Sequence, residues 1–252
     1  KKGLLPASIF IKSLNANLVT GITTDAGGNE TFYVRDPWNN LFQIVKSNSW
    51  FGKGKQLTGG PAGCMIGVSD MEKSKKFYGS ILGYDTVVYD KEGTFEDFKN
   101  LPGGTLKVRR VLLKHSHPRV GAFSKLLGSS EIELVQVQER EQQRIFENRF
   151  WGDMGFIHLC FDITNQQAMK ALCEREGSPF TVDSGEKFDM GEAAGHFSYI
   201  EDPDGALIEF VETKKIPILK KFGWYLDLRK RDALKPLPDW MLKALAFNRV
   251  KE

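Results

Sequence analysis

Two glutamates in this sequence stand among apolar residues, where an ionised side chain is costly. Glu209 follows Leu207 and Ile208, and Glu133 lies in another apolar run. A carboxylate in such a run is expensive to bury unless it is paired or bound to a metal ion. The alternative is an ordinary exposed strand residue, and Glu131 indicates that the strand around Glu133 is partly hydrated. Metal ligation and proton transfer are the chemistries that these carboxylates could perform.

One histidine, His158, begins a short apolar stretch. Taken alone, such a histidine is more often a hydrogen-bonded core residue than a metal ligand. Cys160 lies two positions further along, so on an extended strand it shares the face of His158. We expect Cys160, like Cys64 and Cys173, to be a small buried apolar residue rather than a nucleophile.

The elements that must position these residues come from a repeat. Residues 33–45 align without gaps with residues 199–211, and Gln43 then stands at the position of Glu209. Both copies read as a strand, an Asp-Pro turn and a second, apolar strand. Proline at the second position of the turn, with glycine or asparagine after it, is typical of a tight turn. The pattern predicts a buried strand after each turn.

A second repeat lies upstream, in residues 64–83 and 159–177. Each copy is a short apolar strand, a capping box that marks the start of a helix, and a glycine suited to the helix end. The residues concerned are Ser69, Glu72 and Gly83 in one copy and Thr164, Gln167 and Gly177 in the other. Each repeat unit therefore reads as strand, helix and about three strands, which we call a βαβββ module.

The chain divides into four predicted segments on this basis. Residues 60–140 and 155–213 form two complete modules, and residues 1–50 form a partial module of back-end strands that lacks the opening strand and helix. Residues 214–252 form a basic tail outside the repeat. We expect a short amphipathic helix in this tail, started by Asp239 and packed on the domain or on a partner subunit.

The assembled pattern resembles the vicinal oxygen chelate superfamily, which includes glyoxalase I, methylmalonyl-CoA epimerase, extradiol dioxygenases and bleomycin-resistance proteins. The resemblance covers most of the chain up to about residue 212. It implies an α+β fold of paired βαβββ modules that form a curved-sheet cup. The residues that carry it are Ile66 to Ser74 with Phe77, Tyr78, Leu82 and Gly83; His158; and Asp202 to Gly205 followed by Leu207, Ile208 and Glu209.

Metal ligands in this family come from the first and last strands of each module. The resemblance implies last-strand ligands at Glu133 and Glu209 and a first-strand ligand at His158. In the earlier module the first-strand position falls on Gly63, which has no side chain to offer. The partial module has Gln43 at its last-strand position.

One histidine and two carboxylates would suit a divalent metal such as Zn, Mn, Ni, Co or Fe, and the sequence does not choose among them. Such a metal could hold two adjacent substrate oxygens and stabilise an enediolate. Glu133 or Glu209 could then move a proton at the carbon next to a carbonyl. The leading prediction is a glyoxalase- or epimerase-like lyase or isomerase that acts on a small molecule with adjacent oxygens.

Two alternatives remain open at the level of sequence. An Fe(II)-dependent dioxygenase would need a second histidine where Gly63 stands, unless His115 or His117 replaces it. A metal-free protein of the bleomycin-resistance kind would only bind a small molecule, and the glycine favours this reading slightly. For His196 we expect a structural role at a turn.

Composition limits the remaining classes. A hydrophobic share of 41% and a charged share of 27% indicate a globular protein rather than a disordered one. A net charge of only +3 gives no nucleic-acid footprint. Three cysteines are too few for a disulfide scaffold, and no apolar stretch predicts a signal peptide or a membrane span. We therefore expect a cytoplasmic protein with a small-molecule substrate, no nucleic-acid or membrane partner, and a possible homodimer.

Overall fold

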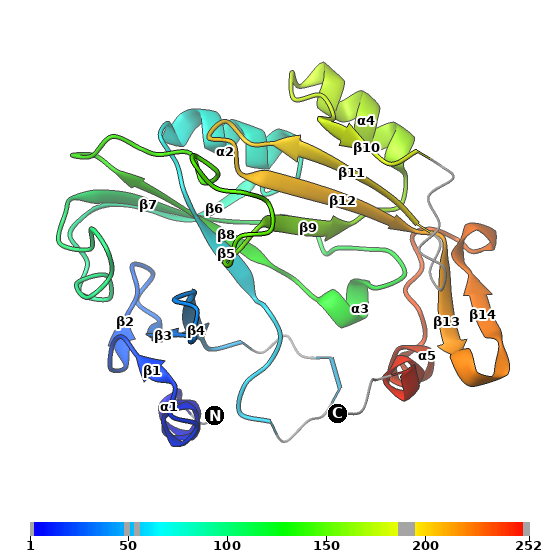
Figure 1. The fold of residues 1–252 in the computed structure, drawn as a ribbon, viewed down its shortest axis with the longest axis horizontal. Coiled ribbons are helices and arrows are strands. Elements are labelled where there is room, and N and C mark those ends of the chain that lie inside the picture. The colour runs from blue at the N-terminus through cyan, green and yellow to red at the C-terminus, as the bar shows by residue number, and fades with distance from the viewer. Residues whose placement is uncertain (1–2, 48–50, 53–55, 186–194, 249–252) are drawn as a thin grey trace. The chain divides into compact units, whose positions relative to one another are not determined.

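The computed structural model describes residues 3–47, 51–52, 56–185 and 195–248 (Figure 1). The chain divides into two compact units. The first unit comprises Lys1–Ser116 and Ser130–Ile157, and the second comprises His117–Ser129 and His158–Glu252. The outer ends of the predicted segments 1–50 and 214–252 lie outside the described residues.

The first unit begins with the partial module. Its elements are α1 (Leu5–Ser13), β1 (Asn17–Leu18), β2 (Thr23–Thr24), β3 (Glu30–Arg35) and β4 (Leu41–Val45). Both β1 and β2 pair with one edge of β3, and β4 pairs with the other edge. The prediction that this fragment lacks its helix is wrong, because α1 precedes the strands. Pro6 in the first turn suits a helix start, where its missing N–H costs no hydrogen bond.

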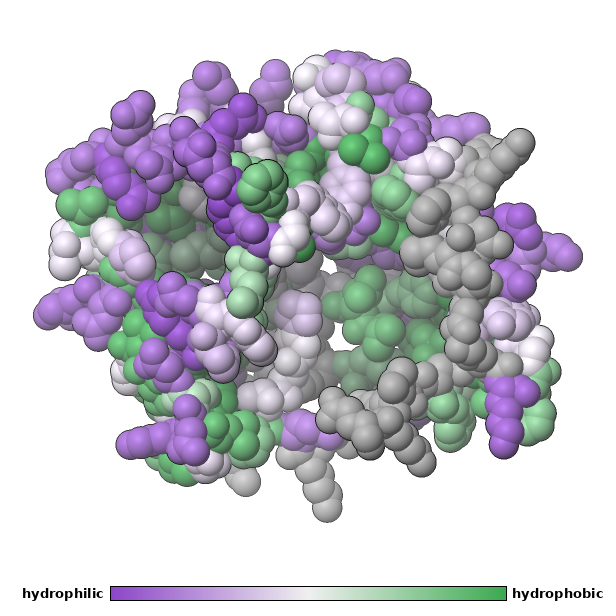
Figure 2. Space-filling view, viewed as in Figure 1, coloured by the Kyte–Doolittle hydropathy of each residue, from purple (hydrophilic) through white to green (hydrophobic). Residues whose placement is uncertain are grey.

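The helix α1 is apolar on more than one face. Leu4, Ala7 and Ile11 are buried against Phe32 and Val34 of β3. Other apolar side chains of the helix reach the surface, and Figure 2 shows hydrophobic residues exposed in this region. They are Leu5, Ile9, Phe10 and Leu14. The helix therefore gives no simple amphipathic pattern, which is why its periodicity is hard to recognise in the sequence.

The first complete module follows in the same unit and confirms the predicted βαβββ order. It contains β5 (Gly63–Gly67), α2 (Met71–Ser80), β6 (Thr86–Gly93), β7 (Val108–Lys114) and β8 (Glu131–Val137). The sheet order is β5-β8-β7-β6, with β5 parallel to β8. The second module, in the second unit, contains β9 (His158–Asp162), α4 (Gln166–Arg175), β10 (Val182–Asp183), β11 (Gly195–Glu201) and β12 (Leu207–Thr213). Its sheet order is the matching β10-β11-β12-β9.

The capping boxes are wrong by one residue at both helix starts. The N-cap of α2 is Asp70, whose carboxylate accepts hydrogen bonds from the backbone N–H groups of Glu72 and Lys73. The N-cap of α4 is Asn165 rather than Thr164. Asp and Asn are caps at least as good as Ser and Thr, so the sequence offers two competent caps at each helix start. Both predicted helix-end glycines do adopt positive φ, 76° at Gly83 and 79° at Gly177.

The gapless repeat is confirmed in atomic detail. Oδ1 of Asp36 accepts hydrogen bonds from the backbone N–H groups of Trp38 and Asn40. Oδ1 of Asp202 accepts the corresponding bonds from Asp204 and Ala206. The turn residues Asn39 and Gly205 both have positive φ, 73° and 83°. The two Asp-Pro turns are therefore the same structure at corresponding positions.

The tail completes the second unit with a hairpin and a short helix. Its strands are β13 (Lys215–Leu219) and β14 (Trp224–Asp227), and its helices are η1 (Lys220–Phe222), η2 (Leu228–Lys230), α5 (Asp239–Ala244) and η3 (Leu245–Asn248). Leu242 and Ala244 of α5 are buried, as expected for a helix that packs on the domain. The segment His117–Ser129, with α3 (Ser124–Leu127), joins this tail, since Nζ of Lys125 lies 2.7 Å from Oδ1 of Asp239. Among the helices in the described part of the chain, none is long and apolar enough to cross a membrane.

Candidate functional site

The two complete modules place their family positions in the same register. In the second module, His158 is opposite Leu207 and Cys160 is opposite Glu209 across the parallel β9–β12 pair. In the first module, Gly63 and Met65 of β5 occupy the corresponding positions opposite β8, and Glu133 is the partner of Met65. The alignment of Gly63 with His158 and of Glu133 with Glu209 is therefore a structural equivalence.

The structure brings His158 and Glu209 together. Nε2 of His158 lies 3.0 Å from Oε2 of Glu209, with side-chain exposures of 25% and 15%. The hydroxyl of Tyr199, on the neighbouring strand β11, donates a hydrogen bond of 2.9 Å to Oε1 of Glu209. Each oxygen of this carboxylate thus has its own neighbour, and Oε2 is the one turned toward the imidazole.

This group lies on the sheet face that α4 does not cover. The opposite face is sealed by α4, because Gln166 binds the carbonyl oxygens of His196 and Phe210, and the hydroxyl of Ser198 donates to its amide oxygen. Side chains alternate along a strand, so Phe197 and Tyr199 point away from the helix. The site is therefore built on the open face of the second sheet.

Two further residues of this face were not recognised from the sequence. Tyr199 is the counterpart of Tyr33 in the repeat, and only that correspondence could have drawn attention to it. Asp162 follows His158 and Cys160 at alternating positions of β9, so it lies on the same face. Burial raises the pKa of the Asp162 carboxyl to about 6, which is suited to proton transfer near neutral pH.

Cysteine burial differs from one residue to the next. Cys173 is buried as expected and Cys64 is intermediate, but Cys160 is exposed, so the prediction that it is buried is wrong. Partial desolvation and the nearby Glu209 carboxylate raise the pKa of the Cys160 thiol to about 12. The thiolate is therefore scarce at neutral pH, in line with the expectation that Cys160 is no nucleophile.

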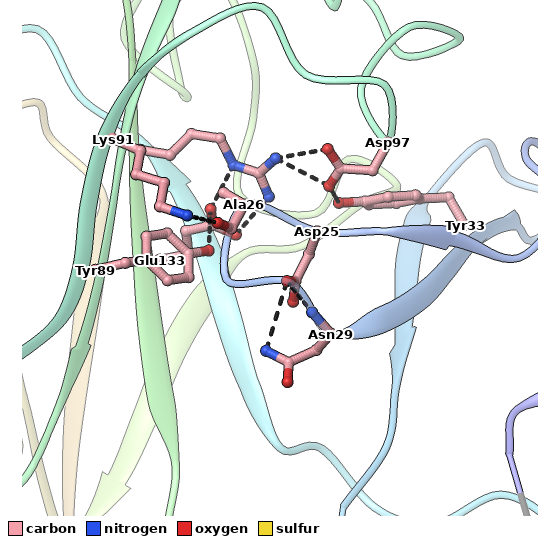
Figure 3. Close-up of polar contacts among 9 residues, drawn as sticks. Asp25, Ala26, Asn29, Tyr33, Tyr89, Lys91, Asp97 and Glu133 are labelled. Carbon is pink, nitrogen blue, oxygen red and sulfur yellow. Dashed lines mark hydrogen bonds and ion pairs between the residues drawn. The ribbon is translucent and has the colours of Figure 1, made fainter.

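Glu133 has a different environment in the first unit. Its Oε1 accepts hydrogen bonds from Nε of Arg110 at 2.6 Å and from the hydroxyl of Tyr89 at 2.7 Å. Its Oε2 accepts one from Nη2 of Arg110 at 3.2 Å. The residue is 4% exposed, so the carboxylate is occupied by protein donors (Figure 3). The sequence did not single out Arg110, because Arg109 beside it is equally basic. The alternation of polar and apolar residues does not tell which of the two arginines points inward.

The glycine at the fourth family position is required by the backbone. A Cβ atom built on Gly63 would lie 1.9 Å from the carbonyl oxygen of Glu131 in the paired strand. No side chain fits there unless β5 moves away from β8. The absence of a ligand at this position is therefore a structural property of the first module.

His115 and His196 contact residues outside the His158–Glu209 pair. The ring of His115 lies against Tyr84, with centroids 3.9 Å apart, and its Nε2 is 3.1 Å from the carbonyl oxygen of Leu82. His196 has a structural contact on the α4 side of its sheet, with Nε2 at 2.6 Å from Oδ1 of Asp183. This contact lowers the pKa of Asp183 to about 2.

The donor atoms of the His158–Glu209 pair are of types that bind divalent metal ions. Imidazole nitrogen and carboxylate oxygen each bind zinc at about 2.1 Å, so two such donors on one ion lie roughly 3 to 3.5 Å apart. The observed 3.0 Å between the two atoms is the distance of a direct hydrogen bond or ion pair, and it also lies within that spacing. Within the described residues, no cluster of three or more His, Cys, Asp or Glu side chains is arranged to hold a metal. The metal role predicted for Glu133 stays a prediction.

Comparisons with known proteins agree with this architecture. The chain resembles a glyoxalase I variant from Zea mays, with 14% identity, a TM-score of 0.51, and coverage of 84% of this chain and 64% of that one. A glyoxalase family protein from Enterococcus faecalis matches 62% of this chain over its own full length, with 18% identity and a TM-score of 0.44. The chain thus spans less than two thirds of the maize protein. No curated protein sequence matches it significantly.

The maize structure shows the fold alone, since its identity to this chain is low. The family itself is shown by sequence. The family model of the Glyoxalase/Bleomycin resistance protein/Dioxygenase superfamily matches residues 61–210, which is more than half of the chain and runs from β5 of the first complete module into β12 of the second. Together with the βαβββ order and the shared register of the two modules, this match establishes that the chain belongs to that superfamily.

Proposed function

We propose that the chain is a divalent-metal-dependent enzyme of the glyoxalase or epimerase type, a lyase or isomerase, whose reactive centre is the His158–Glu209 pair. The observation that carries the proposal is the 3.0 Å approach of His158 Nε2 to Glu209 Oε2 on the open face of the second sheet. In this proposal His158 and Glu209 are the protein ligands, and water or the substrate would complete the coordination.

A bound metal would supply a Lewis acid that holds two adjacent substrate oxygens and stabilises an enediolate. The protein would contribute orientation and proton transfer. Tyr199 fixes one oxygen of Glu209 and so orients the other toward His158. Asp162 is ionised above a pH of about 6, which makes it a candidate base beside Glu209 for removing a proton next to a carbonyl.

The metal content of the purified full chain tests this proposal. The parent protein should carry close to one transition-metal ion, and His158→Ala and Glu209→Ala should each lose it. Matched controls are His117→Ala, in an exposed loop of the same unit, and Glu212→Ala, on the same strand as Glu209 but facing α4. These controls should retain the metal. Activity would then be screened on 2-oxo aldehydes, acyl-CoA thioesters and catechols.

Two outcomes would change the proposal. Catechol turnover that requires Fe(II) and O₂ would replace it with the dioxygenase alternative. A parent protein that holds no metal and takes none up on addition would overturn it.

A metal-free small-molecule binding protein is the second candidate. One observation favours it. Of the four positions that supply ligands in this family, Gly63 has no side chain and Glu133 is engaged by Arg110. Calorimetry with planar and apolar ligands in the presence of chelator distinguishes the two functions, because a chelator-resistant ligand would support binding without chemistry.

A further inference from the structure

The first unit contains a buried cation at the position where its module would hold a metal ion. The guanidinium of Arg110, on β7, is 0% exposed and lies between two carboxylates. Its Nε and Nη2 bind Glu133, and its Nη1 donates to both oxygens of Asp97 at 2.8 and 2.9 Å. Figure 3 labels the two carboxylates that bind this guanidinium, Glu133 and Asp97, on opposite sides of the cluster.

Aromatic residues enclose the cluster. The guanidinium carbon lies 3.7 Å from the ring centroid of Phe98, a cation–π contact that adds to the ion pairs. Tyr89 donates to Glu133, and Tyr33 of the partial module donates to Oδ2 of Asp97 at 3.3 Å. Burial, with the adjacent carboxylates, raises the pKa of both tyrosines well above its usual value, so both remain neutral donors.

The partial module fills the face of the first sheet on which this cluster lies. Tyr33 joins Phe98, Val108 and Val135 in one buried apolar group. On the β6 side of the cluster, Nζ of Lys91 donates a hydrogen bond of 2.6 Å to the carbonyl oxygen of Ala26. This bond holds the β2–β3 turn beside Tyr89 (Figure 3). This face of the first sheet is therefore packed as a core, whereas the corresponding face of the second sheet is partly exposed.

The register makes the comparison between the modules direct. Glu133 and Glu209 hold the same place in their sheets, yet one faces a guanidinium and the other an imidazole. The residue that corresponds to Arg110 in the second module is Phe197, since Arg110 is opposite Val135 and Phe197 is opposite Val211. The second module thus has no arginine at this position to neutralise its glutamate.

We infer that the Arg110 guanidinium replaces a metal ion in the first module, so that Glu133 is a structural anion and not a metal ligand. A metal ion at Glu133 would have to displace a buried cation from this carboxylate, and would leave the guanidinium with Asp97 alone of its two carboxylate partners. The inference rests on the first unit alone and holds whether or not the second unit binds a metal.

The first experiment compares Glu133→Gln with Glu209→Gln in the full chain by metal content and thermal unfolding. Glu133→Gln should keep the metal content of the parent and lower the melting temperature by several degrees, because Arg110 loses a charged partner. Glu209→Gln should lose metal and leave the melting temperature of the metal-free protein nearly unchanged. Metal loss in a folded Glu133→Gln variant would overturn the inference. If Glu133→Gln does not fold, the triple variant Arg110→Met, Glu133→Leu and Asp97→Asn replaces it. It removes the charge of all three buried groups and should retain the parent metal content.

A second experiment does not depend on metal in the parent. In a background of His158→Ala and Glu209→Ala, removing the guanidinium by Arg110→Ala leaves Glu133 and Asp97 facing a cavity. Guanidinium chloride at millimolar concentration should raise the melting temperature of this variant, and Mn²⁺ or Zn²⁺ should do the same. Restoring Arg110 in the same background should abolish both shifts. Equal shifts with and without Arg110, or no shift with either cation, would contradict the inference.

Discussion

The hydroxyl of Tyr199 donates a 2.9 Å hydrogen bond to Oε1 of Glu209, on the strand beside it. This contact leaves Oε2 to face Nε2 of His158. Groups that hold a metal ligand in place typically change metal affinity 10- to 100-fold when removed. We therefore expect Tyr199→Phe to weaken divalent-metal binding by about tenfold or more, measured by competition with a chromogenic chelator.

The control for this prediction is Tyr33→Phe, because Tyr33 is the counterpart of Tyr199 in the repeat and its hydroxyl contacts Asp97. That variant should leave metal affinity unchanged. Equal affinity in Tyr199→Phe and the parent would show that Tyr199 does not orient Glu209.

The close approach of β5 and β8 predicts that alanine substitutions at two glycines of β5 will have very different effects on stability. Gly63→Ala places a Cβ atom 1.9 Å from a backbone oxygen, whereas Gly67→Ala meets nothing within 4 Å. We expect Gly63→Ala to lower the unfolding free energy by about 3 kcal/mol and Gly67→Ala to change it by less than about 1 kcal/mol. Urea denaturation measures both. A mild effect of Gly63→Ala would mean that β5 shifts freely.

Asp162 should give the protein a pH-dependent stability of a defined sign. Its pKa in the folded chain is about 6, above the value of about 3.9 for an unfolded chain. The folded state therefore binds more protons between about pH 4 and pH 6, so unfolding free energy falls as pH rises through this window and levels off above it. Asp162→Asn should remove this slope and stabilise the protein at pH 7 by about 1 to 2 kcal/mol.

Thermal or urea unfolding from pH 4 to 8 checks this expectation, with Glu174→Gln on the exposed side of α4 as the control. Glu174→Gln should preserve the slope of the parent. An unchanged slope in Asp162→Asn would assign the pH dependence to another group.

We expect the hydrogen bonds of the Gln166 side chain to be the main polar contacts that hold α4 on its sheet. Its amide nitrogen lies 3.1 Å from each of two carbonyl oxygens, and its amide oxygen accepts a bond from Ser198. Gln166→Ala removes three hydrogen bonds from a buried site, so it should cost about 2 to 4 kcal/mol of unfolding free energy. Gln167→Ala, at the adjacent exposed position, should change it by about 0.5 kcal/mol or less. Similar costs for the two variants would refute this role.

Much of the fold could be predicted because the chain repeats itself. The offset that joins residues 33–45 to 199–211 predicted the two Asp-Pro turns, and the structure confirms them down to the Asx hydrogen bonds. The helix starts were missed by one residue, since Ser-Asp and Thr-Asn pairs each offer two competent caps. The helix α1 was missed because its apolar residues surround it.

The candidate site was only half predictable. His158 and Glu209 belong to neighbouring parallel strands whose register follows from the module pattern, so their approach could be expected. The partners of Glu133 could not, because Asp97 lies in a loop and Tyr33 belongs to a different module. Contacts of this kind depend on how segments far apart in the sequence fold onto one another, and no local pattern encodes them.

The tight contact at Gly63 limits how the first module of this protein could be engineered. A ligand cannot be introduced at Gly63 through one substitution, because any side chain at that position first breaks a strand pair. Release of Glu133 would also require the loss of Arg110, and each intermediate step lowers stability. Attempts to build a new metal site in this protein should therefore start from the open face of the second module rather than from the first.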